Sequence, residues 1–455
     1  MLNLSGCDQQ VKGRTVSIHV SQNHPLIKLA LAIPWEKLAE IVLDDLKKTT
    51  TKGSWWLGRN LYIRTHLGAY LLQKMLNKKD REIAQDLSEN AAFRVFAGEG
   101  LFKEWSAPHS TKIEEFRNRL SPETHLRVSN LYAQIAVKMG FAQAQHVDMD
   151  STVQEPGMTY PSDAKLMTQL VERCLKVTNW VKRKTKSIVP KDFFVNLKEV
   201  KSKAKGYFFL AKNATKDAKQ KCFAEIHRVA KREIYNCLDI FSQLGSKKIE
   251  EMPWNIRRSY DQIASQAKRY MLDVAHFIRT GSIKPGKTLS FHLNDVACIV
   301  KNKVGKPYEF GRVFQVGRLK GNFVWSAPHT TVRMDDKSAL PPLLEVHERL
   351  FDGIEIESCA TDKSYYSLVN EQAVLEALST TGIMHLGYQY EDVNDDLDSQ
   401  LKDHRAGIEA IIGHIKSGGQ LGKSRMKSDE GNLSAGYAAM GGFNLRQLMR
   451  YLVKS

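Results

Sequence analysis

Cysteines are few and widely separated in this chain. Six occur among 455 residues, and no two of them form a C-x-x-C pair. Zinc ribbons and disulfide-rich scaffolds need closely spaced or regularly paired cysteines, so neither architecture is indicated. We expect reduced thiols, most of them buried.

Membrane and export signals are also missing. No apolar run approaches the roughly 18 residues of a membrane span, and the N-terminal stretch MLNLSGCDQQVKGR lacks the apolar core of a secretory signal. No repeat of solenoid period occurs. These absences predict a cytoplasmic protein without a membrane partner.

Acidic residues are outnumbered. The chain has 67 Lys and Arg against 50 Asp and Glu, a formal net charge of +17 and a pI near 9.4. Such a balance favours a polyanionic partner, and we favour nucleic acid, with localisation at the nucleoid, over an anionic membrane surface. The length and the 42% hydrophobic content allow two or three folded domains.

Hydrophobic periodicity divides the chain into five segments. Residues 1–140 predict an N-terminal helical domain and residues 165–285 a basic helical insertion. Residues 141–164 and 286–425 predict two parts of one α/β core, and residues 426–455 a tail helix behind a glycine-rich connection. Strand-like runs such as GRVFQVGR, GNFVWSAPHT and GIEIESCATD alternate with helices, which predicts a mixed sheet flanked by helices.

The basic insertion has two interpretations. Its lysines and arginines, including Lys182, Arg183 and Lys184, could form an ordinary solvated helical face. They could equally form a surface that follows DNA phosphates, where each neutralised phosphate releases counterions. We expect the aromatic residues between them to pack helices rather than to stack on bases.

The stretch HRAGIEAIIGHIK, residues 404–416, predicts a helix with two adjoining stripes. Ile408, Ile411, Ile412 and Ile415 form the apolar stripe. At roughly 100° per residue, Arg405, Glu409 and Lys416 fall within about 40° of one another. Arg405 and Glu409 have the i, i+4 spacing of a solvated ion pair worth only about 0.2–0.5 kcal/mol.

Three carboxylates predict a metal site at one edge of the sheet. Asp150 and Asp362 each end a predicted strand, and Glu409 lies on the late helix. Such a cluster needs cations, and its hard oxygen ligands select Mg²⁺, with Mn²⁺ as a substitute. Two such ions about 3.5–4 Å apart can activate and stabilise the oxygens of phosphodiester chemistry.

Structural roles compete with this interpretation. Asp148 is a rival to Asp150, because residues two apart on a strand share a face. Ser151 and Thr152 could make Asp150 a turn residue, and strand-end carboxylates often serve as caps.

The sequence resembles bacterial insertion-sequence transposases of the DDE superfamily with a Tyr-x2-Arg-x3-Glu-x6-Lys signature. Arg405, Glu409 and Lys416 match its last three positions, whereas Lys402 stands at the tyrosine position. DSTVQEPGMTYPSDAKL from Asp150 resembles the first-aspartate motif, and ATDKSYYS resembles the second, with an Asp-x-x-Tyr pattern at Asp362 and Tyr365. HPLIKLA and NKKDREIAQDLSENAAFRVFAG resemble the N-terminal transposase domain of such proteins.

This resemblance implies an RNase H-like core in which Asp150, Asp362 and Glu409 hold two Mg²⁺ ions. Water would cleave the DNA strand at the end of the insertion sequence, and the freed 3′-hydroxyl would attack target DNA. Arg405, Lys416, Tyr365 and the Lys182–Lys184 cluster would contact DNA, and a homodimer would hold two terminal inverted repeats in a synaptic complex. Two alternatives remain open at this stage: a transposase-derived DNA-binding protein without activity, and an RNase H-like nuclease that hydrolyses without joining.

Overall fold

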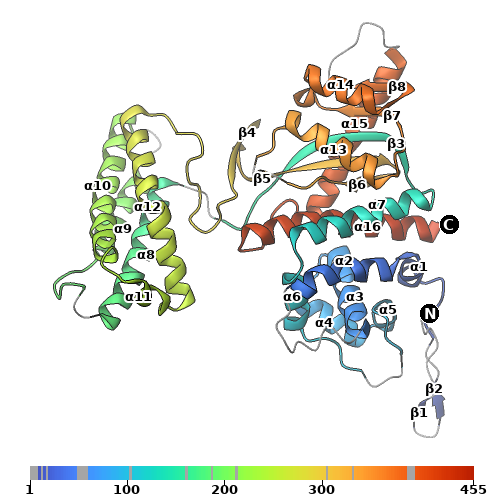
Figure 1. Ribbon diagram of the computed structural model, residues 1–455, viewed down its shortest axis with the longest axis horizontal. Helices are drawn as coiled ribbons and strands as arrows, with labels where there is room; N and C mark the ends of the chain where they lie inside the picture. The colour runs from blue at the N-terminus through green and yellow to red at the C-terminus, as the bar shows by residue number, and fades with distance from the viewer. Residues whose placement is uncertain are drawn as a thin grey trace. The chain divides into compact units, whose positions relative to one another are not determined.

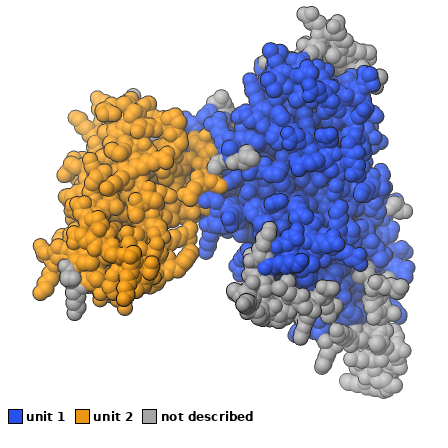
Figure 2. Space-filling model, in the orientation of Figure 1, with its two compact units in different colours: residues 1–157, 299–455 blue, residues 158–298 orange. Residues whose placement is uncertain are grey.

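The computed structural model separates the chain into two compact units (Figures 1 and 2). Residues 1–157 and 299–455 form the first unit, and residues 158–298, an interval that contains the expected insertion, form the second. The residues that the structure describes are 9–11, 14–16, 19–48, 60–101, 105–158, 162–185, 188–210, 214–303, 306–329, 331, 333–386 and 395–454.

Helices make up the N-terminal part of the first unit. A short hairpin, β1 (Gln9–Val11) and β2 (Arg14–Val16), precedes them. The helices are α1 (Pro25–Ala32), α2 (Trp35–Lys48), α3 (Asn60–Leu76), α4 (Asp80–Glu89), α5 (Ala91–Phe96), α6 (Ser110–Asn118) and α7 (Pro122–Lys138). Their starts follow capping rules: before α7, the Ser121 hydroxyl accepts a hydrogen bond from the Thr124 N–H, and Pro122 takes the first helical position.

A mixed sheet forms the centre of the first unit. Its strands are β3 (Gln143–Gln154), β4 (Ala297–Lys303), β5 (Lys306–Lys320), β6 (Phe323–Trp325), β7 (Ile356–Thr361) and β8 (Leu378–His385). The order is β4-β5-β3-β7-β8, and β6 also pairs with β5. β3 runs antiparallel to β5 and parallel to β7, which is parallel to β8. The α/β class with a mixed sheet and flanking helices is therefore confirmed.

Strand alternation gives the two faces of β3 different partners. Val147 and Met149 are buried in the same apolar cluster as residues of α7 and of α13 (Asp336–Leu350). Asp148 contacts α15 (Asp395–Ser417), which covers the other face. The predicted isoleucine stripe of α15 is confirmed, since all four isoleucines are buried with Phe314 and Val316 of β5. Between β7 and β8 lie the short helix η2 (Lys363–Tyr365) and α14 (Leu368–Ala377).

The C-terminal helix is longer and more central than the sequence suggests. α16 spans Asp429–Lys454 and packs beside α7, α3 and α1 (Figure 1). Its glycines lie inside the helix rather than in a connection. A Cβ on Gly436 would lie 2.2 Å from the Phe314 ring, and one on Gly442 would lie 2.3 Å from the Lys74 carbonyl oxygen. Glycine is used here for close approach, and the N-terminal helices thereby share one apolar core with the sheet.

We predict opposite stability effects for alanine at two helical glycines. Gly442→Ala should destabilise the protein by about 1–3 kcal/mol, because the new methyl group meets the backbone of α3. Gly413→Ala on α15 should stabilise it by about 0.5–1 kcal/mol, because nothing lies within 4 Å of that Cβ position. Urea unfolding of both variants tests this pair; equal effects would contradict it.

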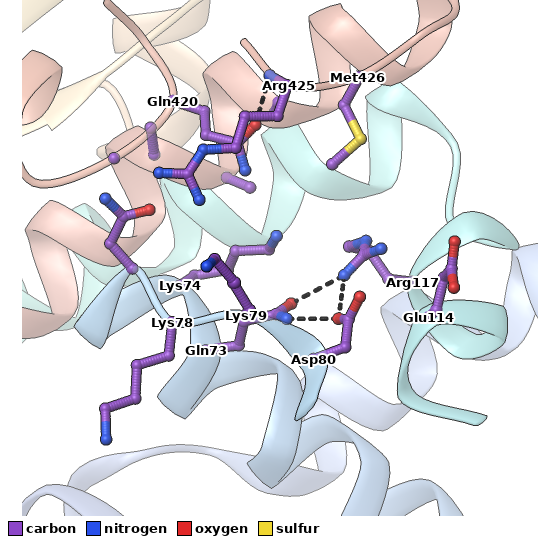
Figure 3. Close-up of a pocket in the computed structure, with 15 residues that line it drawn as sticks. Gln73, Lys74, Lys78, Lys79, Asp80, Glu114, Arg117, Gln420, Arg425 and Met426 are labelled. Atoms are coloured by element: carbon purple, nitrogen blue, oxygen red, sulfur yellow. Dashed lines mark hydrogen bonds and ion pairs between the residues drawn. The ribbon is translucent and has the colours of Figure 1, made fainter. Parts of the chain in front are cut away.

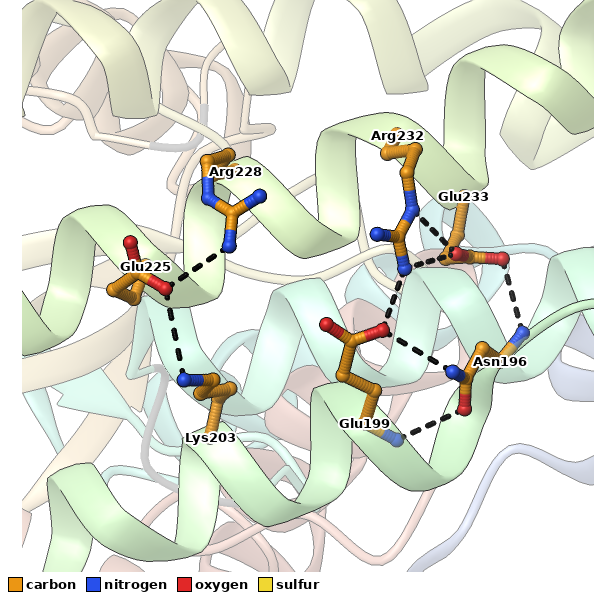
Figure 4. A network of polar contacts seen from close by, with 7 residues as sticks. All are labelled: Asn196, Glu199, Lys203, Glu225, Arg228, Arg232 and Glu233. Carbon is orange, nitrogen blue, oxygen red and sulfur yellow. Dashed lines mark hydrogen bonds and ion pairs between the residues drawn. The ribbon is translucent and has the colours of Figure 1, made fainter.

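The second unit is a set of helices with its own apolar cluster. Its helices are α8 (Asp163–Lys184), α9 (Leu197–Phe209), α10 (Lys216–Phe241), α11 (Ser246–Glu250) and α12 (Trp254–Thr280). Part of its basic surface is neutralised internally, as Figure 4 shows between α9 and α10. Arg232 pairs with Glu199 at 2.6 Å, and Glu225 accepts from Arg228 at 3.1 Å and lies 3.6 Å from Lys203. These cations hold two helices together.

Candidate active site

Asp150 lies on β3, and Asp362 directly follows the neighbouring parallel strand β7. The register aligns Met149 of β3 with Thr361 of β7, so the next residue on each strand is one of the two aspartates. Asp362 then caps η2, where its carboxylate accepts the Lys363 N–H at 2.6 Å. Parallel pairing thus brings together two carboxylates that are 212 positions apart in the chain.

Arg405 connects these aspartates to Glu409. Its Nη2 atom lies 3.6 Å from Asp362 Oδ2 and 3.8 Å from Glu409 Oε1, and its charge also acts on Asp150. The Glu409 side chain is 70% exposed and that of Asp362 is 47% exposed. Exposed pairs at such distances contribute at most about 1 kcal/mol each. Two carboxylates therefore contact one guanidinium that is only weakly held, and the charge of this guanidinium also acts on Asp150.

Asp150 is the least solvated of the three carboxylates. Burial raises the pKa of Asp150 to about 6; the Ser151 N–H and Arg405 lower it, and the charges of Asp362 and Asp336 raise it. The Ser151 N–H donates to Asp150 Oδ1 at 2.7 Å. Burial and the nearby charges of Asp362 and Asp336 therefore make the ionised form of Asp150 unfavourable in the absence of a cation.

We predict that Asp150→Asn stabilises the protein above pH 7. The raised pKa means that the folded state holds this proton more tightly than the unfolded chain, so the ionised carboxylate costs stability as pH rises through about 6. The variant should gain about 1–3 kcal/mol at pH 8 and nothing below pH 4. Thermal unfolding in EDTA at both pH values measures this.

Asp403→Asn, an exposed change on α15, is the control, and its free energy of unfolding should stay within about 0.5 kcal/mol of that of the unchanged protein. An equal gain from Asp150→Asn at pH 4 and pH 8 would show that the charge of Asp150 is not the cause.

The rival carboxylate, Asp148, is fully buried in an ion-pair network. Arg318 donates to Asp148 Oδ2 through Nε at 2.6 Å, and Nη2 of the same arginine donates to the His404 carbonyl at 2.6 Å. His404 Nδ1 lies 2.6 Å from Asp148 Oδ1. A Cβ on Gly407 would lie 2.3 Å from Arg318 Nη1, so glycine makes room for this arginine. Asp148 thus attaches α15 to β3 at His404, the residue before Arg405.

Buried hydrogen bonds hold the turn that follows Asp362 in place. Tyr365 is fully buried, and its hydroxyl donates to Gln315 Oε1 at 2.5 Å. Asn370 donates to the Tyr365 carbonyl and to the Lys337 carbonyl, the acceptor that Pro341 leaves without a helical N–H partner. Tyr365 therefore supports the aspartate turn and does not face solvent. Sequence reasoning did not identify Gln315 or Asn370 in this role.

The remaining basic candidates occupy different environments. Lys416 is half-buried on α15, and Lys402 is exposed on the same helix. In the second unit, the Lys182 ammonium donates to the Phe193 carbonyl, whereas Arg183 and Lys184 are exposed at the end of α8. Arg183 and Lys184 are thus the members of this cluster that face solvent.

The donor set of the site is chemically suited to a hard divalent cation. Its carboxylate oxygens are the ligands that Mg²⁺ prefers, and their repulsion is offset here by a guanidinium. Within the described ranges, no three His, Cys, Asp or Glu side chains are grouped closely enough to hold a metal.

Two comparisons with known proteins found a similarity. Residues 14–119 match the family model described as a transposase domain (DUF772). A Rhizobium meliloti protein described as "Uncharacterized protein ORF8 in nfe locus" is 21% identical over 160 residues, which cover 34% of this chain and 74% of that protein. No solved structure matches with significance. Among the described helices, none is long and apolar enough to cross a membrane. The N-terminal region is thus similar to a transposase domain.

Proposed function

We propose that this protein is an insertion-sequence transposase that cleaves DNA at terminal inverted repeats and transfers the strand to target DNA. The proposal rests on two observations: the register of β3 and β7 brings Asp150 and Asp362 to neighbouring positions, and Arg405 Nη2 lies 3.6 Å from Asp362 and 3.8 Å from Glu409. The transposase domain matched at residues 14–119 supports the same function independently of that site.

An RNase H-like core is part of the proposal. β4 is left out of the count because it leads out of the second unit. The remaining strands of the sheet are, in chain order, β3, β5, β6, β7 and β8. Asp150 therefore lies in the first strand and Asp362 follows the fourth. Glu409 lies on α15, the helix after the last strand. The strand order β6-β5-β3-β7-β8, with three antiparallel and then two parallel strands, supports this assignment.

Asp150, Asp362 and Glu409 would hold Mg²⁺, or Mn²⁺ in its place. When bound, the ions supply activation of the attacking oxygen and stabilisation of the departing one. With a pKa of about 6, Asp150 is mostly ionised at neutral pH and can serve as a negatively charged ligand. Arg405, once released from Glu409, is placed to hold a backbone phosphate with its planar fork, and Lys416 to hold a second as a point charge.

Double-stranded DNA is the proposed partner, both as inverted repeats and as target. The N-terminal helices and the exposed Arg183 and Lys184 would supply contacts away from the reacting phosphate. Two copies would join two ends in a synaptic complex at the nucleoid. Tyr365 and Lys182 are left out of the DNA contacts, because the first is buried and the second is bonded to a backbone carbonyl.

Pre-cleaved DNA ends provide the test. The purified protein is incubated in Mg²⁺ with a supercoiled plasmid and short duplexes that carry the inverted repeats flanking its gene. Joined products support the proposal. Hydrolysis without joining would assign a nuclease instead, and end binding without either reaction would assign a DNA-binding protein.

A further inference from the structure

A second polar site lies between the N-terminal helices and the segment that joins α15 to α16. It is a cavity of about 250 Å³. Figure 3 shows Gln420 and Arg425 on one side, with Lys74 and Asp80 on the other. Three short side chains of α16 also line it and leave the space open: Ala435, Ala438 and Ala439.

Cations exceed carboxylates around this cavity. Five basic residues line it, namely Lys74, Lys78, Lys79, Arg117 and Arg425, against the two acids Asp80 and Glu114. Lys78 is paired with Asp86 at 2.5 Å, and the Lys79 ammonium lies 3.9 Å from Glu82 Oε1. Asp80 already accepts hydrogen bonds from Arg117 and from Gln73. The carboxylates present therefore leave part of the positive charge without a counterion.

Two donors at this cavity have no acceptor among the described residues. The Lys74 ammonium makes no hydrogen bond there and lies 5.6 Å from the centre of the Tyr70 ring. Arg117 Nε is buried without a hydrogen-bond partner. Burial lowers the pKa of Lys74 to about 7, Arg117 lowers it further, and Asp80 raises it. Buried donors without acceptors cost free energy, which an oxyanion between them would recover.

We propose that this cavity binds a phosphate group through Lys74, Arg117 and Arg425. The phosphate belongs either to a DNA backbone or to a free phosphate or pyrophosphate. The inference rests on the proposed function only for DNA as the source; the anion site itself rests on the cavity and its donors.

Hydrogen bonds join the end of β3 to the segment that lines this cavity. The Gln154 side-chain amide donates to the Gln420 carbonyl at 2.8 Å, Glu155 N–H donates to Gly422 at 2.9 Å, and Ser424 N–H donates to Glu155 at 2.8 Å. β3 carries Asp150, and α15 leads directly into this segment. A bound phosphate would thus touch helices matched by the transposase domain and the segment that follows the Glu409 helix.

Proton uptake accompanies binding, because an anion raises the pKa of Lys74 back toward its ordinary value. The charged and titratable groups around Lys74 come from several elements: Tyr70 of α3, Lys79 and Asp80 at the start of α4, Glu114 and Arg117 of α6, His125 of α7, and Arg425. A backbone phosphodiester, whose charge is the same at both pH values, should therefore bind more tightly at pH 6 than at pH 8.5.

Amine labelling of the full chain tests the proposal. An acylating reagent is applied at pH 7.5, and Lys74 and the exposed Lys138 of α7 are quantified by peptide mass spectrometry. Saturating inorganic phosphate, pyrophosphate or a short DNA duplex should slow labelling of Lys74 about threefold, since a rise of its pKa from about 7 by one unit lowers the free-amine fraction at pH 7.5 from about three-quarters to about one-quarter. Lys138 should be unchanged by phosphate and pyrophosphate.

The pattern of protection identifies the source of the phosphate. Protection by the duplex alone assigns a backbone phosphate, and protection by inorganic phosphate or pyrophosphate assigns an anion site that free ligand also fills. Protection by none of the three overturns the proposal. The phosphate arm does not depend on strand cleavage, so failure of the proposed function leaves it interpretable.

Two variants with small expected effects on folding test the same site by DNA binding. Lys74→Met retains the aliphatic chain, and Arg425→Gln changes an exposed side chain. Each should weaken duplex binding about tenfold and reduce the salt slope by about one, whereas Lys138→Gln should do neither. If both variants fold and bind phosphate and the duplex as the unchanged protein does, the cavity is not the site.

Discussion

Glu409→Gln should reduce DNA strand cleavage in Mg²⁺ by about 10³-fold or more, while binding of end DNA stays within about twofold. The substitution removes one negative ligand from the proposed metal site. Metal stabilisation of the reacting oxygens is worth several kcal/mol, and each 1.36 kcal/mol corresponds to a factor of ten in rate. Gel analysis of nicked products and anisotropy of labelled ends measure the two effects separately.

Folding should be unaffected in this variant. The Glu409 side chain is 70% exposed, and its contact in the described structure is an ion pair with Arg405 at 3.8 Å. Asp403→Asn, an exposed change on the same helix, is the matched control and should cleave normally. Cleavage by Glu409→Gln at the unchanged rate would remove Glu409 from the active site and leave the two aspartates to be explained separately.

Local periodicity was sufficient to predict the helix that carries Glu409. The isoleucine stripe of α15 recurs every three or four residues, so the sequence itself indicates the face that packs and the face that carries charge. The mixed sheet was also predictable, because strand-like runs rich in Val, Ile and Phe alternate with helical ones. Both features depend on residues that are close in the chain.

Long-range contacts were not predictable in this way. Glycines in a single sequence indicate turns, yet Gly436 and Gly442 lie within α16, because Phe314 and the backbone of Lys74 approach them closely. These partners are more than one hundred residues away. Period-two alternation on β3 likewise puts Asp148 and Asp150 on one face, but only the position of Arg318 shows that Asp148 is the carboxylate in the buried ion pair.

Asp148→Asn should destabilise the protein by about 3–5 kcal/mol, a large share of the 5–15 kcal/mol typical of a folded protein. Asp148 is 0% exposed and the Arg318 side chain is 6% exposed, so the variant leaves a guanidinium buried without its counterion. It also weakens the attachment of α15 at His404. Denaturant unfolding followed by circular dichroism measures the loss.

A double replacement distinguishes the buried charge from simple loss of packing. Asp148→Leu combined with Arg318→Met removes both charges and keeps most of the volume, and apolar replacement of a buried ion pair is often neutral or stabilising. We expect the double variant to recover most of the stability that Asp148→Asn loses, although α15 then lacks the bond from Arg318 to the His404 carbonyl. If Asp148→Asn unfolds at the denaturant concentration of the unchanged protein, the network does not hold α15 on β3, and the position of Arg405 and Glu409 must come from the isoleucine stripe alone.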